Sequence, residues 1–124
     1  MTSACHDSAS VSILLVEDHK DSREILANLL AHCGYEVSTA ANMQDALTLI
    51  NDLRFEILVC DIGLPDGSGL DLVAEAKKRQ AWKKTVALTA HEDQSDLGLR
   101  AGFDEFLTKP FDFNQLRSIL AQSR

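Results

Sequence analysis

Short apolar segments alternate about five times with amphipathic ones along the 124-residue chain, and this alternation limits the possible folds more than any other feature. The first apolar segment, residues 11–16, reads VSILLV, and a continuous run of this kind is typical of a strand buried on both faces. Residues 20–32 follow with apolar side chains at helical spacing, and Gly34 then provides a helix stop. Repeated strand–helix pairs predict one α/β domain with helices on both faces of a parallel sheet.

The remaining elements follow from the same two patterns. We predict strands at residues 36–40, 55–60, 85–88 and 105–107, and helices from residue 42, after residue 69, over residues 93–101 and from residue 112. Asn42 and Asp112 are the predicted N-caps of two of these helices. The segment GLPDGSG at residues 63–69 is predicted to be a loop because it is rich in turn residues.

Composition supports a single soluble domain. Hydrophobic residues make up 45% of the chain and charged residues 25%, which are ordinary values for a globular protein. The formal net charge of −7 argues against a nucleic-acid groove, which needs clustered Lys and Arg. No apolar run is long enough to insert into a membrane. Residues 1–10 are small and polar, so we predict a disordered arm there, followed by a domain at residues 11–124.

Cysteine and histidine placement gives no support to a zinc site. The three cysteines form no CxxC pair, and the four histidines share no ligand spacing with them. Free thiols in a reducing cytoplasm are the simplest interpretation.

Polar residues follow the apolar strands at the points where a core would not favour them. The residues concerned are Glu17 and Asp18 after the first strand, Asp61 after the third, Thr89 after the fourth and Lys109 near the end of the fifth. The carboxyl ends of parallel strands share one edge of the sheet, which carries the site in open α/β folds. We therefore expect these side chains to meet.

The chemistry of this group favours phosphoryl transfer. Three carboxylates repel one another unless a cation joins them, and oxygen ligands without His or Cys favour a hard ion such as Mg²⁺. Lys109 adds a positive charge and Thr89 a hydroxyl donor, so the group could hold a phosphoryl group beside one carboxylate. Asp61 could then attack phosphorus and form an acyl phosphate.

Several of these residues also have an interpretation that needs no function. Asp18 could cap the following helix, Thr89 could be an ordinary strand residue, and Lys109 could be a surface lysine. Trp82 could anchor a partner or cover the edge of the sheet. The arrival of the polar residues in order at successive strand ends favours a shared site over these separate explanations.

Four segments, LLVEDHKDSR, VCDIGLPDGSG, ALTA and FLTKPF, resemble the signatures of response-regulator receiver domains. The resemblance covers the chain after residue 10 and implies a flavodoxin-like fold with strand order 2-1-3-4-5. It also implies Mg²⁺ as cofactor and a histidine kinase or histidine phosphotransfer protein as phosphoryl donor. DIGLPDGSG with GFDEFLTKP is most similar to receivers of hybrid histidine kinases.

The resemblance assigns a role to each polar position. Asp61 is the phosphoryl acceptor, and Thr89 and Lys109 contact the transferred group. The implied Mg²⁺ ligands are Glu17, Asp18, Asp61 and the backbone carbonyl of Gly63. The domain would catalyse its own phosphorylation and dephosphorylation and act as a stoichiometric carrier. It would be a monomer or a weak homodimer, would have no output domain within these residues, and would signal to an unknown partner.

Further positions are assigned by the same resemblance. Thr89 and Phe106 are the switch residues of an output face built from the fourth strand to the last helix, and Phe106 turns inward when the threonine moves. Phe stands where Tyr is common in the family, so this side chain has no hydroxyl to donate. Pro110 follows a cis peptide bond that directs the lysine into the site. Gly63 and His91 flank the path of attacking water and tune the lifetime of the phosphoryl group.

Three other functions fit the sequence less well. A phosphatase that forms an aspartyl phosphate would carry a second Asp where Gly63 stands. A flavin-binding protein needs a phosphate loop after the first strand, where this chain is acidic, and no GxGxxG nucleotide motif is present. A pseudo-receiver that only binds partners would lack an acidic residue, the threonine or the lysine, all of which are present.

Overall fold

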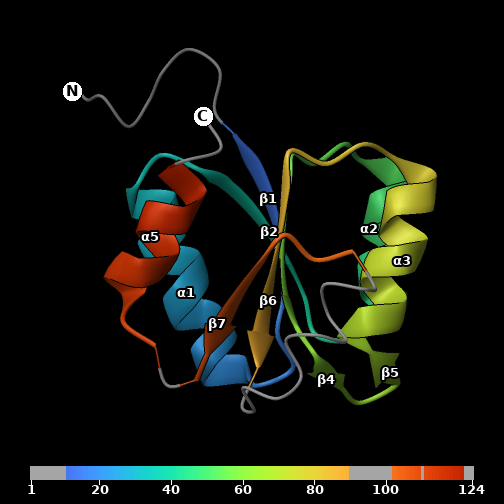
Figure 1. Ribbon diagram of the computed structural model, residues 1–124, viewed down its shortest axis with the longest axis horizontal. Helices are drawn as coiled ribbons and strands as arrows, with labels where there is room; N and C mark the ends of the chain where they lie inside the picture. The colour runs from blue at the N-terminus through green and yellow to red at the C-terminus, as the bar shows by residue number, and fades with distance from the viewer. Residues whose placement is uncertain (1–10, 90–101, 110, 122–124) are drawn as a thin grey trace.

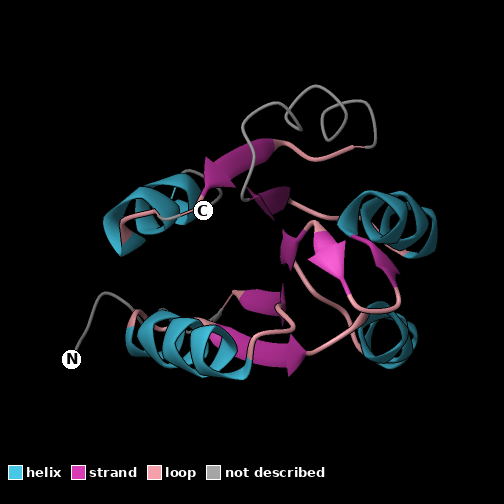
Figure 2. Ribbon diagram, turned by 90° about the horizontal axis from the view of Figure 1, so that it is seen from below, coloured by secondary structure: helices cyan, strands magenta, loops and turns pink. Residues whose placement is uncertain are grey.

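The computed structural model describes residues 11–89, 102–109 and 111–121. Five strands form one parallel sheet: β1 (Ser12–Val16), β2 (Glu36–Ala40), β3 (Ile57–Asp61), β6 (Lys84–Thr89) and β7 (Glu105–Thr108). The helices of the described part are α1 (Lys20–His32), α2 (Met43–Asp52), α3 (Gly69–Arg79) and α5 (Phe113–Ala121). Helices α1 and α5 cover one face of the sheet, and α2 and α3 cover the other (Figures 1 and 2).

The sheet order is β2-β1-β3-β6-β7. Counted over the five parallel strands alone, this is the predicted order 2-1-3-4-5, and the α/β fold class is confirmed. The predicted loop at residues 63–69 is wrong in part, because β4 (Gly63–Leu64) and β5 (Gly67–Ser68) pair there as an antiparallel hairpin. The helix predicted at residues 93–101 and the arm predicted at residues 1–10 lie outside the described residues.

The strands alternate their side chains between two apolar cores. Leu14, Leu58 and Cys60 point towards α2 and α3, whereas Leu15 and Val59 point towards α1 and α5. All five of these side chains are fully buried, which explains why the strands read as continuous apolar runs in the sequence. A charged residue directly after such a strand therefore marks the end of the strand at the edge of the sheet.

The helix ends follow the predicted capping chemistry except at one position. Gly34 has φ 93° after α1, and the amides of Gly34 and Tyr35 donate to Ala31 and Leu30 in a Schellman arrangement. The cap of α1 is His19, whose Nδ1 accepts from the amide of Ser22 at 3.3 Å, so the alternative reading of Asp18 as that cap is wrong.

The predicted caps of the other two helices are confirmed. The side chain of Asn42 accepts from the amide of Asp45 at 2.8 Å at the start of α2. Asp112 accepts from the amide of Asn114 at 3.0 Å in front of α5.

Trp82 lies before β6, at the amino-terminal edge of the sheet. Its ring stacks on Phe55 with centroids 6.2 Å apart, and its indole N–H donates to the carbonyl of Ala76 at 3.0 Å. This placement agrees with the interpretation that Trp82 covers the edge of the sheet. Among the described helices, none combines the length and apolar character needed to cross a bilayer.

Candidate functional site

The strand ends bring the predicted site residues to one edge of the sheet. In the strand register Val16 pairs with Cys60, Asp61 with Leu88, and Thr89 with Thr108. Glu17 and Asp61 therefore stand at the same level, and Thr89 and Lys109 stand one and two residues further along at the carboxyl ends of their strands. The structure thus places these residues at one edge of the sheet.

Lys109 connects the acidic groups directly. Its Nζ lies 2.9 Å from Oε1 of Glu17 and 2.9 Å from Oδ2 of Asp61. The Glu17 side chain is 1% exposed and that of Asp61 is 13% exposed, so both charges lie where water screens them weakly. An interpretation of Lys109 as an ordinary surface lysine is therefore wrong.

Glu17, Asp18 and Asp61 form a compact carboxylate cluster. One oxygen from each lies within 4.8 Å of the others, and the burial rises from exposed Asp18 through Asp61 to fully buried Glu17. Three oxygen donors at this spacing suit a hard divalent cation such as Mg²⁺, which keeps part of its water shell. The predicted metal ligands with carboxylate side chains are thus brought together.

Burial and charge act against each other in this cluster. Burial raises the pKa of Glu17, and the nearby charge of Asp61 raises it further, while the hydrogen bond from Lys109 opposes both. Burial alone would lower the pKa of Lys109, but its hydrogen bonds to Asp61 and Glu17 outweigh burial and raise that pKa. The ammonium form of Lys109 is therefore held in place by its two partners.

The backbone around Asp61 is closely packed. The amide of Gly69 donates to the carbonyl of Ile62 at 2.7 Å, and the amide of Ile62 donates to Leu88 at 3.0 Å. A Cβ on Gly69 would lie 2.5 Å from the Asp61 carbonyl oxygen, closer than any side chain tolerates. Gly69 is required because the start of α3 approaches the acceptor strand at backbone distance.

The β4–β5 hairpin joins this region to α2. Asp66, at the turn of the hairpin, accepts from the amide of Met43 at 2.7 Å and from that of Gln44 at 3.0 Å. These backbone hydrogen bonds lower the pKa of Asp66. Gly63, whose carbonyl is a predicted metal ligand, begins the hairpin two residues after Asp61, and a Cβ there would meet no atom within 4 Å.

Two predicted switch residues lie on the neighbouring strands. Thr89 ends β6 with 1% exposure, and its carbonyl accepts from the amide of Lys109 at 2.7 Å. Phe106 on β7 is half-buried and packs edge-on against Phe103 with ring centroids 6.0 Å apart. His91 and Pro110 lie outside the described residues, so their predicted roles stay predictions.

Arg23 and Asp66 were not identified from the sequence. The guanidinium of Arg23 donates to the backbone carbonyl of Glu17 at 3.0 Å and, less closely, to that of Asp18 at 3.4 Å. Both residues contact backbone groups, which every residue possesses, so composition and periodicity do not single them out. The signal that could have found Arg23 is its position in the segment LLVEDHKDSR, one helical turn after the cap of α1.

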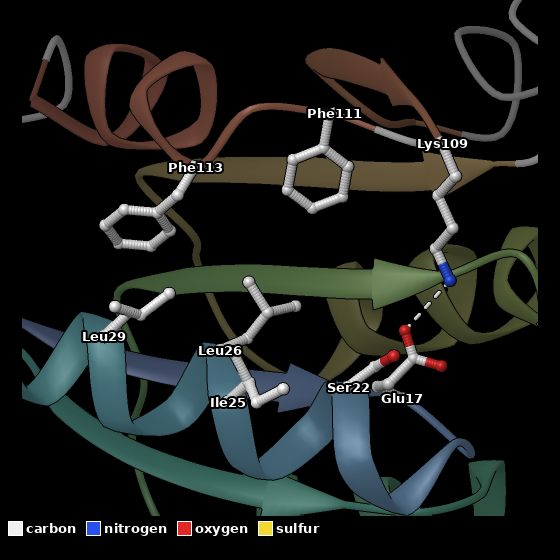
Figure 3. A pocket seen from close by; sticks show the side chains of 8 residues that line it. All are labelled: Glu17, Ser22, Ile25, Leu26, Leu29, Lys109, Phe111 and Phe113. Atoms are coloured by element: carbon white, nitrogen blue, oxygen red, sulfur yellow. Dashed lines mark hydrogen bonds and ion pairs between the residues drawn. The ribbon is translucent and has the colours of Figure 1, made fainter.

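A groove of about 510 Å³ runs from the acidic cluster between α1 and α5. Figure 3 shows Phe111 and Phe113 facing Leu26 and Leu29 across it, with Lys109 at one end. Ile25 on the α1 side is 58% exposed, an unusual value for a large apolar side chain that lines a cavity. The groove therefore offers an apolar surface that is continuous with the charged site.

The sequence is similar to that of known response regulators. Residues 13–121 match the family described as the response regulator receiver domain. The response regulator protein PilR of Pseudomonas aeruginosa is 36% identical over 87% of this chain and 25% of its own length. The transcriptional regulatory protein TcrA of Mycobacterium tuberculosis is 32% identical over 91% of this chain and 46% of its own length. The chain thus spans between a quarter and about half of these curated relatives.

The fold is also similar to that of a solved response regulator structure. The response regulator TrrA of Thermotoga maritima, in complex with Mg²⁺–BeF, superimposes with a TM-score of 0.82 at 34% sequence identity. The match covers 92% of this chain and 99% of that chain. Fold, site geometry and sequence relationship agree, and the chain belongs to the response regulator receiver domain family of two-component systems.

Proposed function

We propose that this chain accepts a phosphoryl group from a partner phosphohistidine onto Asp61 and passes the signal on through its β6–β7–α5 face. The observation that carries the proposal is the position of the Asp61 carboxylate, with the Lys109 ammonium 2.9 Å from Oδ2 and two further carboxylates in reach of a shared cation. The carboxylate of Asp61 is the nucleophile, and positive charge beside it would stabilise the negatively charged phosphoryl group during transfer.

The transfer itself is a simple exchange of bonds. A carboxylate oxygen of Asp61 forms a bond to phosphorus as the phosphorus–nitrogen bond of the donor imidazole breaks, and the imidazole leaves with that electron pair. Hydrolysis removes the phosphoryl group from Asp61. A water oxygen bonds to phosphorus, the bond between phosphorus and the Asp61 oxygen breaks, and a proton passes to solution. Lys109 stabilises the added negative charge in both steps.

Glu17, Asp18 and Asp61, with the carbonyl of Gly63, would hold Mg²⁺. When bound, the ion would neutralise charge on the phosphoryl oxygens. Glu17 is suited to orientation because its Oε2 also accepts from the amide of His19 at 3.2 Å, which fixes the carboxylate plane. Exposed Asp18 leaves the solvent side of the cluster open to the incoming group.

Output is proposed to begin at Thr89, whose hydroxyl would donate to the phosphoryl group. Phe106, which is half-buried and contacts Phe103, would then turn further inward. Gly63 is proposed to tune the phosphoryl lifetime together with His91, and a Cβ at Gly63 would meet no atom within 4 Å, which leaves space there for water. The chain would work in the cytoplasm, as a monomer or weak dimer, on an unknown output partner.

The donor is proposed to bind along the groove between α1 and α5. The phosphohistidine must reach Asp61, and Glu17 and Lys109 belong both to the site and to the groove lining. An apolar helix face on a histidine kinase or histidine phosphotransfer protein would cover Ile25 and Leu29, which are 58% and 37% exposed. This orientation would place the donor imidazole at the charged end of the groove.

The proposal is tested by intact-mass measurement after incubation with acetyl phosphate and Mg²⁺. We expect a gain of one phosphoryl group in the wild type and in the control Asp71→Asn, and no gain without Mg²⁺ or in Asp61→Asn. A gain that persists in Asp61→Asn would move the acceptor elsewhere. No gain from acetyl phosphate or from any phosphohistidine donor would make the chain a pseudo-receiver.

A further inference from the structure

Arg23 lies beside the acidic cluster but touches none of its carboxylates. Its guanidinium Nη1 donates instead to the main-chain carbonyls of Glu17 and Asp18, at 3.0 and 3.4 Å. Among the described residues no Asp or Glu forms an ion pair with Arg23. A half-buried arginine that is paired only with carbonyl groups is held there by the backbone of the acidic segment.

The sheet cannot hold this segment by itself. The amide of Glu17 still donates to the carbonyl of Ala40 at 3.0 Å, which extends the β1–β2 ladder by one group. The next two carbonyls of the chain, those of Glu17 and Asp18, lie beyond the ladder and accept from Arg23. This guanidinium therefore holds two carbonyls of the acidic segment that lie beyond the strand ladder.

The stability of α1 does not explain an arginine here. The residue lies near the amino-terminal end of the helix, where the helix dipole disfavours a positive charge. Its amide already donates to the carbonyl of His19 at 2.9 Å, as any residue at that position of a helix would. The side chain therefore serves the loop before the helix.

We propose that Arg23 is a positioning residue of the metal site, which sets the backbone of Glu17 and Asp18 so that their carboxylates and that of Asp61 fit one Mg²⁺ ion. The inference rests on the proposed function, because it assumes that this cluster binds Mg²⁺. Mg²⁺ requires nearly ideal octahedral geometry at about 2.0–2.1 Å, so small displacements of two ligands weaken its binding.

The direction in which the Mg²⁺ affinity changes when Arg23 is replaced distinguishes a positioning role from a purely electrostatic one. A positive charge near a cation site repels the cation, so loss of Arg23 as a charge alone would tighten Mg²⁺ binding. Loss of Arg23 as a positioning residue would weaken it. Lys20→Ala removes an exposed charge from the first turn of the same helix, and Asn28→Ala shortens an exposed polar side chain one turn further along α1.

The test is calorimetric titration of Mg²⁺ into the wild type, Arg23→Ala, Arg23→Lys and the two controls. We expect Arg23→Ala to weaken Mg²⁺ binding about fivefold or more, Arg23→Lys to restore part of the affinity through one carbonyl contact, and Lys20→Ala to leave it equal or slightly tighter. Phosphorylation of Arg23→Ala by acetyl phosphate should return to the wild-type rate at saturating Mg²⁺.

A second measurement needs no metal. The amide of His19 donates to Glu17 Oε2, so its hydrogen exchange in Mg²⁺-free protein reports on the position of the acidic segment. We expect faster exchange in Arg23→Ala, and also in Arg23→Lys to a smaller degree, which keeps the test informative if the alanine variant unfolds. Unchanged or tighter Mg²⁺ binding in Arg23→Ala would overturn the proposal, whereas absence of Mg²⁺ binding in the wild type would instead overturn the metal site itself.

Discussion

The ammonium of Lys109 lies 2.9 Å from Oε1 of Glu17, a side chain that is 1% exposed, and it shares its charge with Asp61 at the same distance. The lysine therefore bonds to two of the carboxylates that are proposed to bind Mg²⁺. An ion that enters the cluster must compete with the lysine for those oxygens. If such an ion displaced it, the ammonium would stay near Asp61 and could pair with the phosphoryl group that we propose there.

Lys109→Met should separate these two effects. Loss of the ammonium removes a competitor and a repulsive charge, so Mg²⁺ should bind about tenfold more tightly, the effect of roughly 1.4 kcal/mol. Phosphorylation by acetyl phosphate should nevertheless slow by about a hundredfold, because one source of charge stabilisation is lost. Calorimetry and intact-mass kinetics measure the two quantities.

Lys83→Met is the matched control, because Lys83 pairs with Glu56 at the opposite edge of the sheet. It should change neither quantity. Weaker Mg²⁺ binding in Lys109→Met would contradict competition between the ion and the lysine.

Gly69→Ala should destabilise the fold because its Cβ would meet the Asp61 carbonyl oxygen at 2.5 Å. We expect a loss of about 1–3 kcal/mol in the free energy of unfolding, measured by urea denaturation. Gly63→Ala, where the added Cβ meets nothing within 4 Å, is the control and should change stability by much less. Equal losses in both variants would show that the close approach at Gly69 is not the cause.

Asp66 should make stability depend on pH. Its pKa is lowered in the fold by the amides of Met43 and Gln44, so the carboxylate stabilises the fold above the ordinary pKa of Asp. That contribution is lost as the pH falls through the lowered pKa. Asp66→Asn should therefore lower the melting temperature at pH 7, and the difference from the wild type should vanish in strong acid.

The control for this experiment is Asp52→Asn at the other end of α2. Asp52 is exposed and lies where the helix dipole disfavours a negative charge, so its replacement should not destabilise the fold. A difference between Asp66→Asn and the wild type that stays constant with pH would exclude the charged cap as its source.

Ile25→Glu should test the groove as the donor surface. The side chain is 58% exposed, so the fold should tolerate a charge there, but an apolar partner helix should not. Transfer from a phosphorylated histidine phosphotransfer protein should slow about tenfold, the effect of roughly 1.4 kcal/mol, while phosphorylation by acetyl phosphate stays unchanged. Leu53→Glu, at a 49% exposed leucine away from the groove, should leave both rates unchanged. Equal slowing with acetyl phosphate would place the defect in the site.

The parts of the structure that follow from periodicity were predictable from the sequence. Buried strands produce apolar runs, and the carboxyl ends of parallel strands share one edge of the sheet, which is why Glu17, Asp61 and Lys109 could be assigned to that edge. The contact of Lys109 with both carboxylates does not follow from the sequence, because a strand end fixes a residue's level in the sheet and not the direction of its side chain.

Features that depend on backbone contacts were not predictable. The β4–β5 hairpin has two-residue strands, which are too short to show alternation. Asp66 accepts from amides 22 and 23 residues away, and Arg23 donates to carbonyls that every residue possesses. The N-cap of α1 is His19, whereas the sequence also allowed Asp18. The two positions differ by one residue, and local sequence does not fix a helix start that closely.

The stacking of Trp82 on Phe55 has a practical consequence. The only tryptophan of the chain sits at the edge of the sheet opposite the carboxylate cluster, inside packing that the unfolded chain would lose. Its fluorescence emission should therefore change on unfolding and should not change when an ion binds at the carboxylate cluster. Trp82 can therefore serve as a fluorescent probe of folding. A change in its emission upon phosphorylation of Asp61 would mean that a structural change had extended along the strands from one edge of the sheet to the other.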